Sequence, residues 1–169
     1  MEATAYVALG ANLGRRERTI LRAVRRLEST GSTRVRRVSS LYESAAVGIL
    51  DAPPFVNAVA EVVALLRPRD LLERMQAIET ELGRRSGHNQ SREIDLDLVA
   101  FAGHVSDADG LTLPHPRYHE RAFVLVPLCE IAPAFRDPKT GRSIADLVAA
   151  LDDPESVRRV SGRGWIVRA

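Results

Sequence analysis

The chain has 169 residues, of which 45% are hydrophobic and 27% charged, so it can bury a core and is too apolar for gross disorder. Its single cysteine, Cys129, excludes an internal disulfide, and no apolar run approaches the ~20 residues that a transmembrane helix needs. The formal net charge is +2, and Lys139 is the sole lysine among the basic residues. We expect a single cytoplasmic domain over residues 1–169, acting as a monomer or a weak homo-oligomer, without a signal peptide.

The first part of the chain alternates between strand and helix patterns. Apolar residues on one face predict a helix over 16–29, after a first strand at 4–9 and a Gly-containing turn at 10–14. The alternating pattern that follows predicts a second strand. A segment rich in small residues and proline then predicts a long loop before a third strand. These three elements cover residues 34–41, 43–54 and 55–66.

The second part begins with a proline that suits the first turn of a helix. Pro68 opens a run with a regular apolar face, and Gly83 is placed to close that helix in a left-handed conformation. A polar loop follows, and then a fourth strand. Two helices and an extended tail through Trp165 complete the chain. We predict these segments at 84–91, 94–101, 121–130 and 143–151.

This order of elements indicates the fold class. Strand, helix, strand, strand, helix, strand is the split βαβ arrangement of an α+β, ferredoxin-like sandwich. We therefore expect an antiparallel sheet with its helices on one face. The other face would then be open, or covered by loops and the C-terminal extension, and two long loops on that face would form a cleft.

The densest chemical signal is the run from Arg92 to Val99, which holds two aspartates. Side chains alternate along a strand, so Asp95 and Asp97 point to one side and Leu96 to the other. The two carboxylates would lie ~7 Å apart and could share hard cations. Magnesium usually binds one or two carboxylates together with substrate phosphates, whose charge Arg92 could neutralise. The ordinary alternative for Asp-x-Asp is a solvated strand face.

Polar residues elsewhere favour the first of these two interpretations. A loop bounded by prolines presents His115, and the following helix presents Arg121 near its start, where both could bind phosphate or ribose oxygens. Gln76 and Glu79 share one face of the preceding helix at a spacing of three residues. Taken alone, His115 is more often a loop anchor than a ligand, and Gln76 and Glu79 are better explained by a solvated helix face.

An aromatic ring and an amide alternate onto one face of the third strand. Phe55 could stack on a flat heterocycle while Asn57 makes directional hydrogen bonds to its polar edge. A core phenylalanine beside an amide that satisfies the strand edge is an equal alternative for this pair.

Taken together, these stretches resemble the family of 6-hydroxymethyl-7,8-dihydropterin pyrophosphokinases. The resemblance runs in the family's order from about residue 6 to about residue 151, which leaves 152–169 as a C-terminal extension. The matching stretches are ALGANLG at 8–14, REIDLDLV at 92–99, LPHP at 113–116, RAFVL at 121–125 and PLCEIAP at 127–133.

The resemblance implies a step of folate biosynthesis, in which the diphosphate of ATP passes to the hydroxymethyl oxygen of a reduced pterin and AMP is released. It implies two Mg²⁺ ions held by Asp95 and Asp97, and catalytic roles for these aspartates together with Arg92 and Arg121. By the same match, ATP would contact Gln76, Glu79, Arg84, Arg92, Leu98, Thr112, His115 and Arg121. The pterin would contact Phe55, Asn57, Asp95, Phe123 and the segment Ser44, Ala45, Ala46 and Val47.

The chain departs from the family pattern around the expected cover of the pterin. Arg-Trp-Gly-Pro is usual before the arginine that matches Arg92, whereas HNQS stands at 88–91. The only tryptophan is Trp165, so a fold-back of the tail could replace the missing ring. Phe55 stands where the family usually has tyrosine. These changes leave the aspartate pair intact and concern the pterin end of the site.

Other functions remain as alternatives at this point. A divergent homologue could act on another pterin or heterocyclic alcohol, and a catalytically weak paralogue would bind nucleotide without turnover. A basic ferredoxin-like sheet could also bind RNA, but aromatic residues make up only 5% of the chain, and Asp95 and Asp97 would repel phosphate unless a metal ion intervenes. We therefore expect small-molecule substrates, ATP and a reduced pterin, and neither nucleic acid nor membrane.

Overall fold

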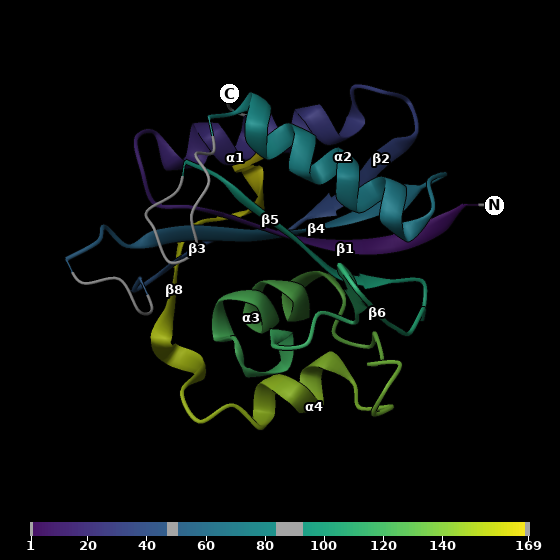
Figure 1. Cartoon of the computed structure of the whole chain (residues 1–169). Coiled ribbons are helices and arrows are strands. Elements are labelled where there is room, and N and C mark those ends of the chain that lie inside the picture. The colour runs from purple at the N-terminus through teal and green to yellow at the C-terminus, as the bar shows by residue number, and fades with distance from the viewer. Residues whose placement is uncertain (1, 47–50, 84–92, 168–169) are drawn as a thin grey trace.

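The structure, a computed structural model, describes residues 2–46, 51–83 and 93–167. Within these residues, a sheet of six antiparallel strands has the order β5-β1-β4-β3-β8, and β2 pairs with the far part of β4 (Figure 1). A short hairpin, β6 with β7, follows β5. The strands are β1 (Ala3–Ala11), β2 (Thr33–Val38), β3 (Leu41–Ser44), β4 (Phe55–Ala64), β5 (Asp95–Phe101), β6 (Ser106–Ala108), β7 (Leu111–Leu113) and β8 (Val157–Ser161).

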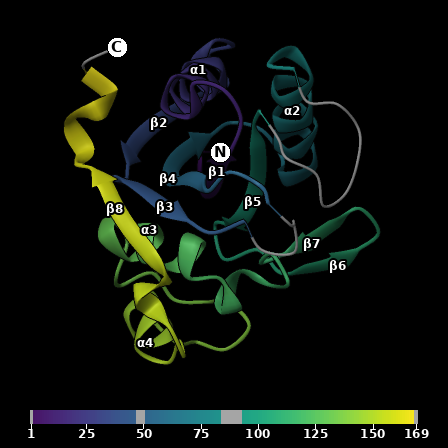
Figure 2. The same ribbon diagram turned by 90° about the vertical axis from the view of Figure 1, so that its left-hand side faces the viewer.

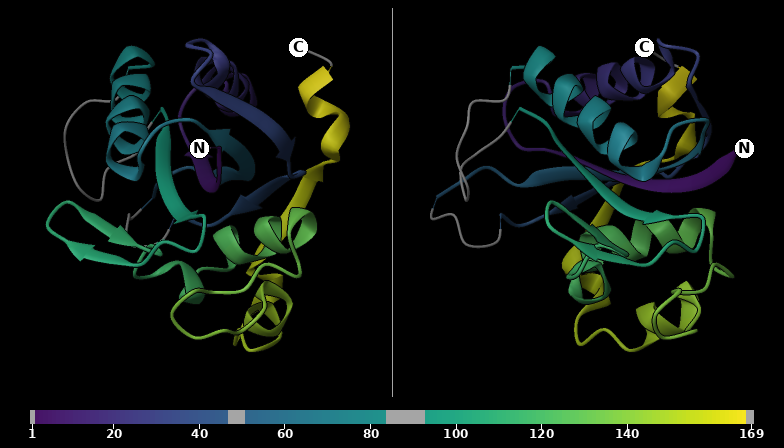
Figure 3. Two further views of the ribbon diagram at one scale, coloured as in Figure 1. Left: turned by 90° about the vertical axis from the view of Figure 1, so that its right-hand side faces the viewer. Right: turned by 45° about the vertical axis from the view of Figure 1, so that its right-hand side comes forward.

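Helices cover both faces of this sheet. α1 and α2 lie on one face, and α3 and α4 lie on the other, as the edge-on views in Figures 1 and 3 show. None of the described helices is long and apolar enough to cross a membrane. The helices are α1 (Arg16–Glu28), α2 (Pro68–Glu81), α3 (Ala122–Ile131) and α4 (Ile144–Ala149), with 3-10 turns η1 (Tyr118–Glu120), η2 (Pro154–Ser156) and η3 (Arg163–Val167).

The α+β class with an antiparallel sheet is confirmed, but the expectation of helices on one face only is wrong. The physical reason lies in β4, where every residue after Phe55 is buried, as happens when both faces of a strand are covered. α3 is apolar on almost every side, so it too must be buried. It forms a second core with residues such as Tyr6 and Val59 on the sheet face opposite α1 and α2.

The predicted second strand is two strands separated by Ser39 and Ser40. Ser39 breaks the regular ladder because its hydroxyl, rather than a backbone carbonyl, accepts the Val59 N–H at 2.9 Å. Ser40 is held by Glu130 of α3, whose carboxylate accepts its N–H and its hydroxyl. The chain then resumes as β3, which extends into the segment predicted as a loop.

The C-terminal segment completes the sheet and the core. β8 pairs antiparallel with β3 and forms an edge of the sheet (Figure 2). The expectation of an extended tail is correct for β8 but wrong for Trp165, which lies in η3. Trp165 is buried in the main core, and its indole N–H donates to the carbonyl of Ser39 at 3.0 Å. Packing of this large ring in the core accounts for the turn, and Trp165 lines neither of the two cavities described below.

Candidate functional site

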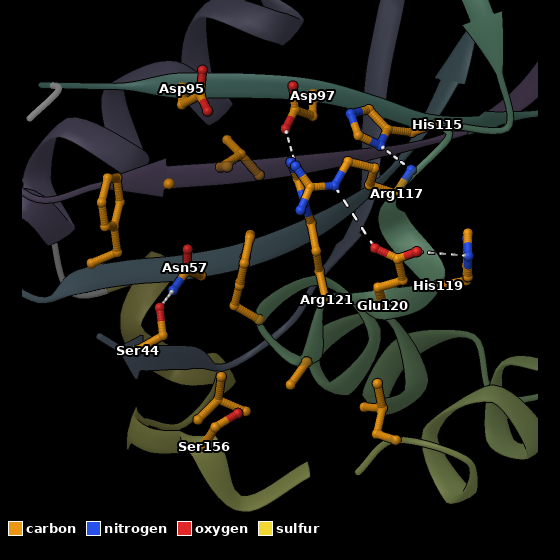
Figure 4. A pocket seen from close by; sticks show the side chains of 18 of the residues that line it. Ser44, Asn57, Asp95, Asp97, His115, Arg117, His119, Glu120, Arg121 and Ser156 are labelled. Carbon is orange, nitrogen blue, oxygen red and sulfur yellow. Dashed lines mark hydrogen bonds and ion pairs between the residues drawn. The ribbon is translucent and has the colours of Figure 1, made fainter. Parts of the chain in front are cut away.

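A cavity of about 1090 Å³ opens beside the ends of β1, β4 and β5. α2 and the η1–α3 connection form further walls, and the chain between α4 and β8 closes the remaining side (Figure 4). A smaller cavity of about 190 Å³ adjoins it and shares Asp97 and His115. The two spaces together can hold more than one small molecule.

β5 brings Asp95 and Asp97 to the large cavity. Burial alternates over the first four residues of the strand, so both carboxylates face the cavity (Figure 4) while Leu96 belongs to the main core. Between them, the Leu96 N–H donates to Glu79 of α2 at 2.7 Å. Glu79 is only 2% exposed, so its buried carboxylate fixes the strand at the residue between the two aspartates.

Arg121 reaches the aspartates from the opposite wall. It is the N-cap of α3 with extended backbone, which turns its side chain across the cavity. Its Nη1 lies 3.5 Å from Asp97 Oδ2, and its guanidinium lies 5.6 Å from the centre of the Phe123 ring. Guanidinium and carboxylates therefore converge on one space, as expected for binding a phosphate chain with its counter-ions.

His115 stands beside this group on a fixed loop. The backbone N–H of His115 donates to the backbone carbonyl of Val99 at 2.8 Å, which holds the loop against β5. Burial lowers the pKa of the imidazole, and the positive charge of Arg121 acts in the same direction against the opposing charge of Asp97. Its Nδ1 accepts the Arg117 N–H at 3.2 Å, so the neutral ring carries its proton on Nε2 as a donor.

The other end of the cavity is built around Asn57 and Phe55. Asn57 is 4% exposed, and its Nδ2 donates to Ser44 Oγ at 3.0 Å and to the carbonyl of Tyr42 at 3.3 Å. Both amide protons are therefore used, and the amide oxygen points into the cavity (Figure 4). Gly10 of β1 lies against both side chains, because a Cβ there would be 3.2 Å from Asn57 Oδ1.

Most of the residues predicted from the sequence meet in these two cavities. Leu98 and Thr112 line the small one, and Ala46 lines neither. Val47, Arg84, Arg92 and the stretch at 88–91 lie outside the described residues. The large cavity is lined by the predicted residues Ser44, Ala45, Phe55, Asn57, Gln76, Glu79, Asp95, Asp97, His115, Arg121 and Phe123.

Sequence reasoning missed one wall of the cavity entirely. The chain from α4 to β8 contributes Leu151, Asp153 and Ser156, which come near β3 because β8 pairs with it. No local sequence pattern predicts the pairing of β8 with β3, since the paired residues are more than 100 positions apart. Gly10 was part of a recognised stretch, and its position facing Asn57 follows from its pairing with that residue across β1 and β4.

The acidic residues of β5 are Asp95 and Asp97, so this strand can offer two carboxylates to a metal ion. Among the described residues, no group of three or more His, Cys, Asp and Glu side chains could hold a metal ion. A cation at Asp95 and Asp97 would take its other ligands from water and phosphate, which suits Mg²⁺ rather than a fully protein-ligated metal.

Comparison with known proteins identifies the family. A family model described as 7,8-dihydro-6-hydroxymethylpterin-pyrophosphokinase (HPPK) matches residues 6–133. The chain belongs to the HPPK family. The 2-amino-4-hydroxy-6-hydroxymethyldihydropteridine pyrophosphokinase of Pseudomonas aeruginosa is 42% identical over 158 residues, which cover 93% of this chain and 96% of that protein.

Longer proteins also contain regions similar to this chain. The folic acid synthesis protein fol1 of Pneumocystis carinii is 41% identical over 149 residues, 88% of this chain but only 20% of fol1. A crystal structure of HPPK-DHPS in complex with substrates has a TM-score of 0.72 at 12% identity, over 94% of this chain and 47% of that one. The chain thus spans about half of that solved chain, and the likeness shows a shared fold.

The HPPK match contains nearly the whole site. All four of Asp95, Asp97, His115 and Arg121 lie within residues 6–133, and so does the Asn57 end of the cavity. The wall between α4 and β8 lies beyond the matched residues.

Proposed function

We propose that this chain transfers the diphosphate of ATP to the hydroxymethyl group of 6-hydroxymethyl-7,8-dihydropterin, releasing AMP, in folate biosynthesis. The observation that carries this function is the convergence of Asp95, Asp97 and Arg121 on one space that continues to Asn57. One end suits a charged phosphate chain and the other a flat polar ring. The activity named for relatives such as the Pseudomonas aeruginosa protein supports the same reaction.

The reaction requires a defined exchange of bonds. The hydroxymethyl oxygen forms a bond to the β-phosphorus of ATP, while the bond between that phosphorus and the oxygen bridging to the α-phosphorus breaks. The hydroxyl proton is released and AMP leaves. Positioning and charge neutralisation dominate the catalysis of such transfers, so the chain must hold the acceptor oxygen in line and stabilise negative charge.

Asp95 and Asp97 would hold two Mg²⁺ ions together with phosphate oxygens and water. Both aspartates supply hard oxygen ligands from one strand face, and Leu96 bonded to Glu79 keeps them at a fixed separation. Magnesium, when bound, supplies neutralisation of the phosphate charge. Arg92, in the adjoining stretch, would contribute further positive charge.

The remaining residues bind and orient the two substrates. Arg121 would exchange its ion pair with Asp97 for the phosphate chain, and His115 would donate its Nε2–H to an oxygen of ATP. Leu98 and Thr112 would hold the base in the small cavity. The pterin would lie between Phe55 and Phe123, with the Asn57 oxygen accepting a ring N–H.

The structure weakens the alternative of an RNA-binding sheet. RNA recognition modules stack bases on an open sheet face, and here helices cover both faces. The alternative of a different pterin or heterocyclic alcohol shares the site and is an outcome of the experiment below.

Quantifying AMP from ATP and magnesium, with and without 6-hydroxymethyl-7,8-dihydropterin, tests the function. We expect pterin-dependent AMP that is lost in Asp95→Asn and Asp97→Asn. Asp107→Asn, on exposed β6 and paired with Lys139, is the matched control and should keep full activity. AMP formation only with another heterocyclic alcohol would replace the acceptor, and nucleotide binding without AMP from any acceptor would refute the enzyme.

A further inference from the structure

Arg16 ties the start of α1 to the chain that enters β4. Its Nη1 donates to the carbonyl of Pro54 at 2.6 Å and to Glu43 Oε2 of β3 at 3.1 Å. The side chains of Arg16 and Glu43 are 29% and 24% exposed, so solvent screens this ion pair only in part. Nearby, Asn12 is 1% exposed and its Nδ2 donates to the carbonyl of Pro53 at 3.2 Å.

These bonds lie next to the end of β4 at which its backbone pairing with β1 and β3 stops. The β3–β4 ladder ends at Ser44 opposite Phe55, and the β1–β4 ladder ends at Ala11 opposite Val56. Pro53 and Pro54 have no N–H to extend either ladder, so only their carbonyls can be held. Asn12 and Arg16 donate hydrogen bonds to these two carbonyls, so side chains hold the chain where the backbone pairing ends.

A second arginine strengthens the anchor from the C-terminal strand. Arg158 of β8 donates to the other carboxylate oxygen of Glu43, with its Nη2 3.0 Å from Oε1. Glu43 therefore lies between two guanidinium groups and has a fixed orientation. The carboxylate that Arg16 bonds to is thus itself held in place by β8.

The anchored residue stands directly before the ring at the pterin end of the cavity. Pro54 precedes Phe55, which lines the cavity, and Asn57 follows two residues later on the same side of the strand. A shift of the Pro54 carbonyl would move the Phe55 ring, which lies 3.6 Å from where a Cβ on Gly10 would stand. The nucleotide end, at Asp97 and His115, is carried by other strands and loops.

We infer that Arg16 is a positioning residue for the acceptor substrate, which fixes Phe55 and Asn57 without touching the substrate itself. This inference rests on the proposed function for the identity of that acceptor. One nitrogen of Arg16 makes both bonds, so the ammonium of lysine could replace it, whereas the thioether of methionine could not.

Two sets of measurements on Arg16→Met and Arg16→Lys test the inference, with Arg18→Met on the exposed face of the same helix as the matched control. We expect Arg16→Met to raise the KM for 6-hydroxymethyl-7,8-dihydropterin about tenfold and the KM for ATP less than about twofold, as the loss of a charge-assisted hydrogen bond would do. Arg16→Lys should restore most of the effect, and Arg18→Met should match the parent.

Amide hydrogen exchange in the ligand-free protein tests the positioning role of Arg16 separately from the proposed function. In Arg16→Met we expect faster exchange at residues 55–57 and unchanged exchange at 59–62, whatever the acceptor substrate is. Unchanged exchange at 55–57, equal increases in both KM values, or failure of Arg16→Lys to restore the pterin KM would each overturn the positioning role. Absence of pterin-dependent AMP with the expected exchange pattern would refute only the proposed function.

Discussion

Arg121 Nη1 lies 3.5 Å from Asp97 Oδ2, so the start of α3 and the middle of β5 are joined across the cavity by an ion pair. The side chains are 25% and 34% exposed, so a ligand in the cavity could reach both of them. In the absence of substrate, each group partly neutralises the other. A phosphate chain with its cations would give each of them a stronger partner.

The first prediction concerns Arg121. Arg121→Met should lower kcat about 10²- to 10³-fold, because it removes a guanidinium aimed at charge that develops during transfer. The stability should change little, since Arg121 is not part of a core cluster. Steady-state AMP formation and thermal unfolding give the two values.

The control is Arg136→Met, whose guanidinium bonds to the Gly141 carbonyl outside the cavity, and it should behave as the parent. A kcat for Arg121→Met above half of the parent value would exclude a role of Arg121 in stabilising that charge.

The second prediction concerns the buried carboxylate of Glu79. Glu79→Ala leaves the Leu96 N–H without this acceptor and should cost about 1–3 kcal/mol of unfolding free energy. It should also lower kcat, because Asp95 and Asp97 flank Leu96. Glu79→Gln keeps an acceptor oxygen and should lose less of both.

Urea unfolding and AMP formation measure these effects side by side. Glu73→Ala, on the exposed face of the same helix, is the control and should change neither quantity. If Glu79→Ala lowers stability while kcat stays at the parent value, Glu79 supports the fold without setting the aspartate geometry.

Local sequence pattern was enough to predict which strand residues lie together on one side. The two-residue period of β5 puts Asp95 and Asp97 on one side, and the same period relates Phe55 to Asn57. Both pairs face the large cavity as predicted. Helix α1 and helix α2 were also predicted closely, because each has a regular apolar face.

Long-range packing accounts for what could not be predicted. β8 reaches β3 through pairs such as Ser44 with Val157, and nothing local in the sequence specifies that neighbour. The same pairing carries the chain before β8 to the cavity. Glu79 was expected on a polar helix face, but its bond to Leu96 depends on how α2 sits on β5. Trp165 was considered as a replacement lid, but its ring belongs to the main core.

The third prediction uses the close approach of Gly10 to the acceptor end of the cavity. An alanine Cβ at this position would lie 3.2 Å from Asn57 Oδ1 and 3.6 Å from the Phe55 ring. Asn57 cannot easily move, because it bonds to Ser44 and Tyr42. Gly10→Ala should therefore raise the pterin KM about three- to tenfold, in line with the usual cost of overpacking.

The control for this change is a glycine with open space around it. Gly162→Ala meets no atom within 4 Å and should leave both KM values unchanged. Initial rates at varied pterin and at varied ATP separate the two constants. A Gly10→Ala enzyme with a normal pterin KM would show that Asn57 and Phe55 do not bind the acceptor substrate.

The last prediction concerns stability at alkaline pH. Tyr42 of β3 donates its hydroxyl to Glu130 Oε2 of α3 at 2.7 Å. Burial, with the bond to Glu130 as a second cause, raises the pKa of Tyr42 from 10.0 to about 12. The folded state therefore holds the phenol proton more tightly than the unfolded state. This contribution to stability is complete below pH 10 and is lost as pH rises through 12.

Urea unfolding at several pH values between 9 and 12 should reveal this loss when the parent is compared with Tyr42→Phe. Tyr42 can contribute at most about 1.4 kcal/mol of unfolding free energy per pH unit, the value for one proton. The parent should lose stability more steeply than Tyr42→Phe between pH 10 and 12, while the two run parallel below pH 9.5. Burial also raises the pKa of Tyr6 and of Tyr118, so both proteins keep a common slope and only their difference reports Tyr42. Parallel curves over the whole range would show that the phenol bonded to Glu130 titrates alike in the folded and unfolded states.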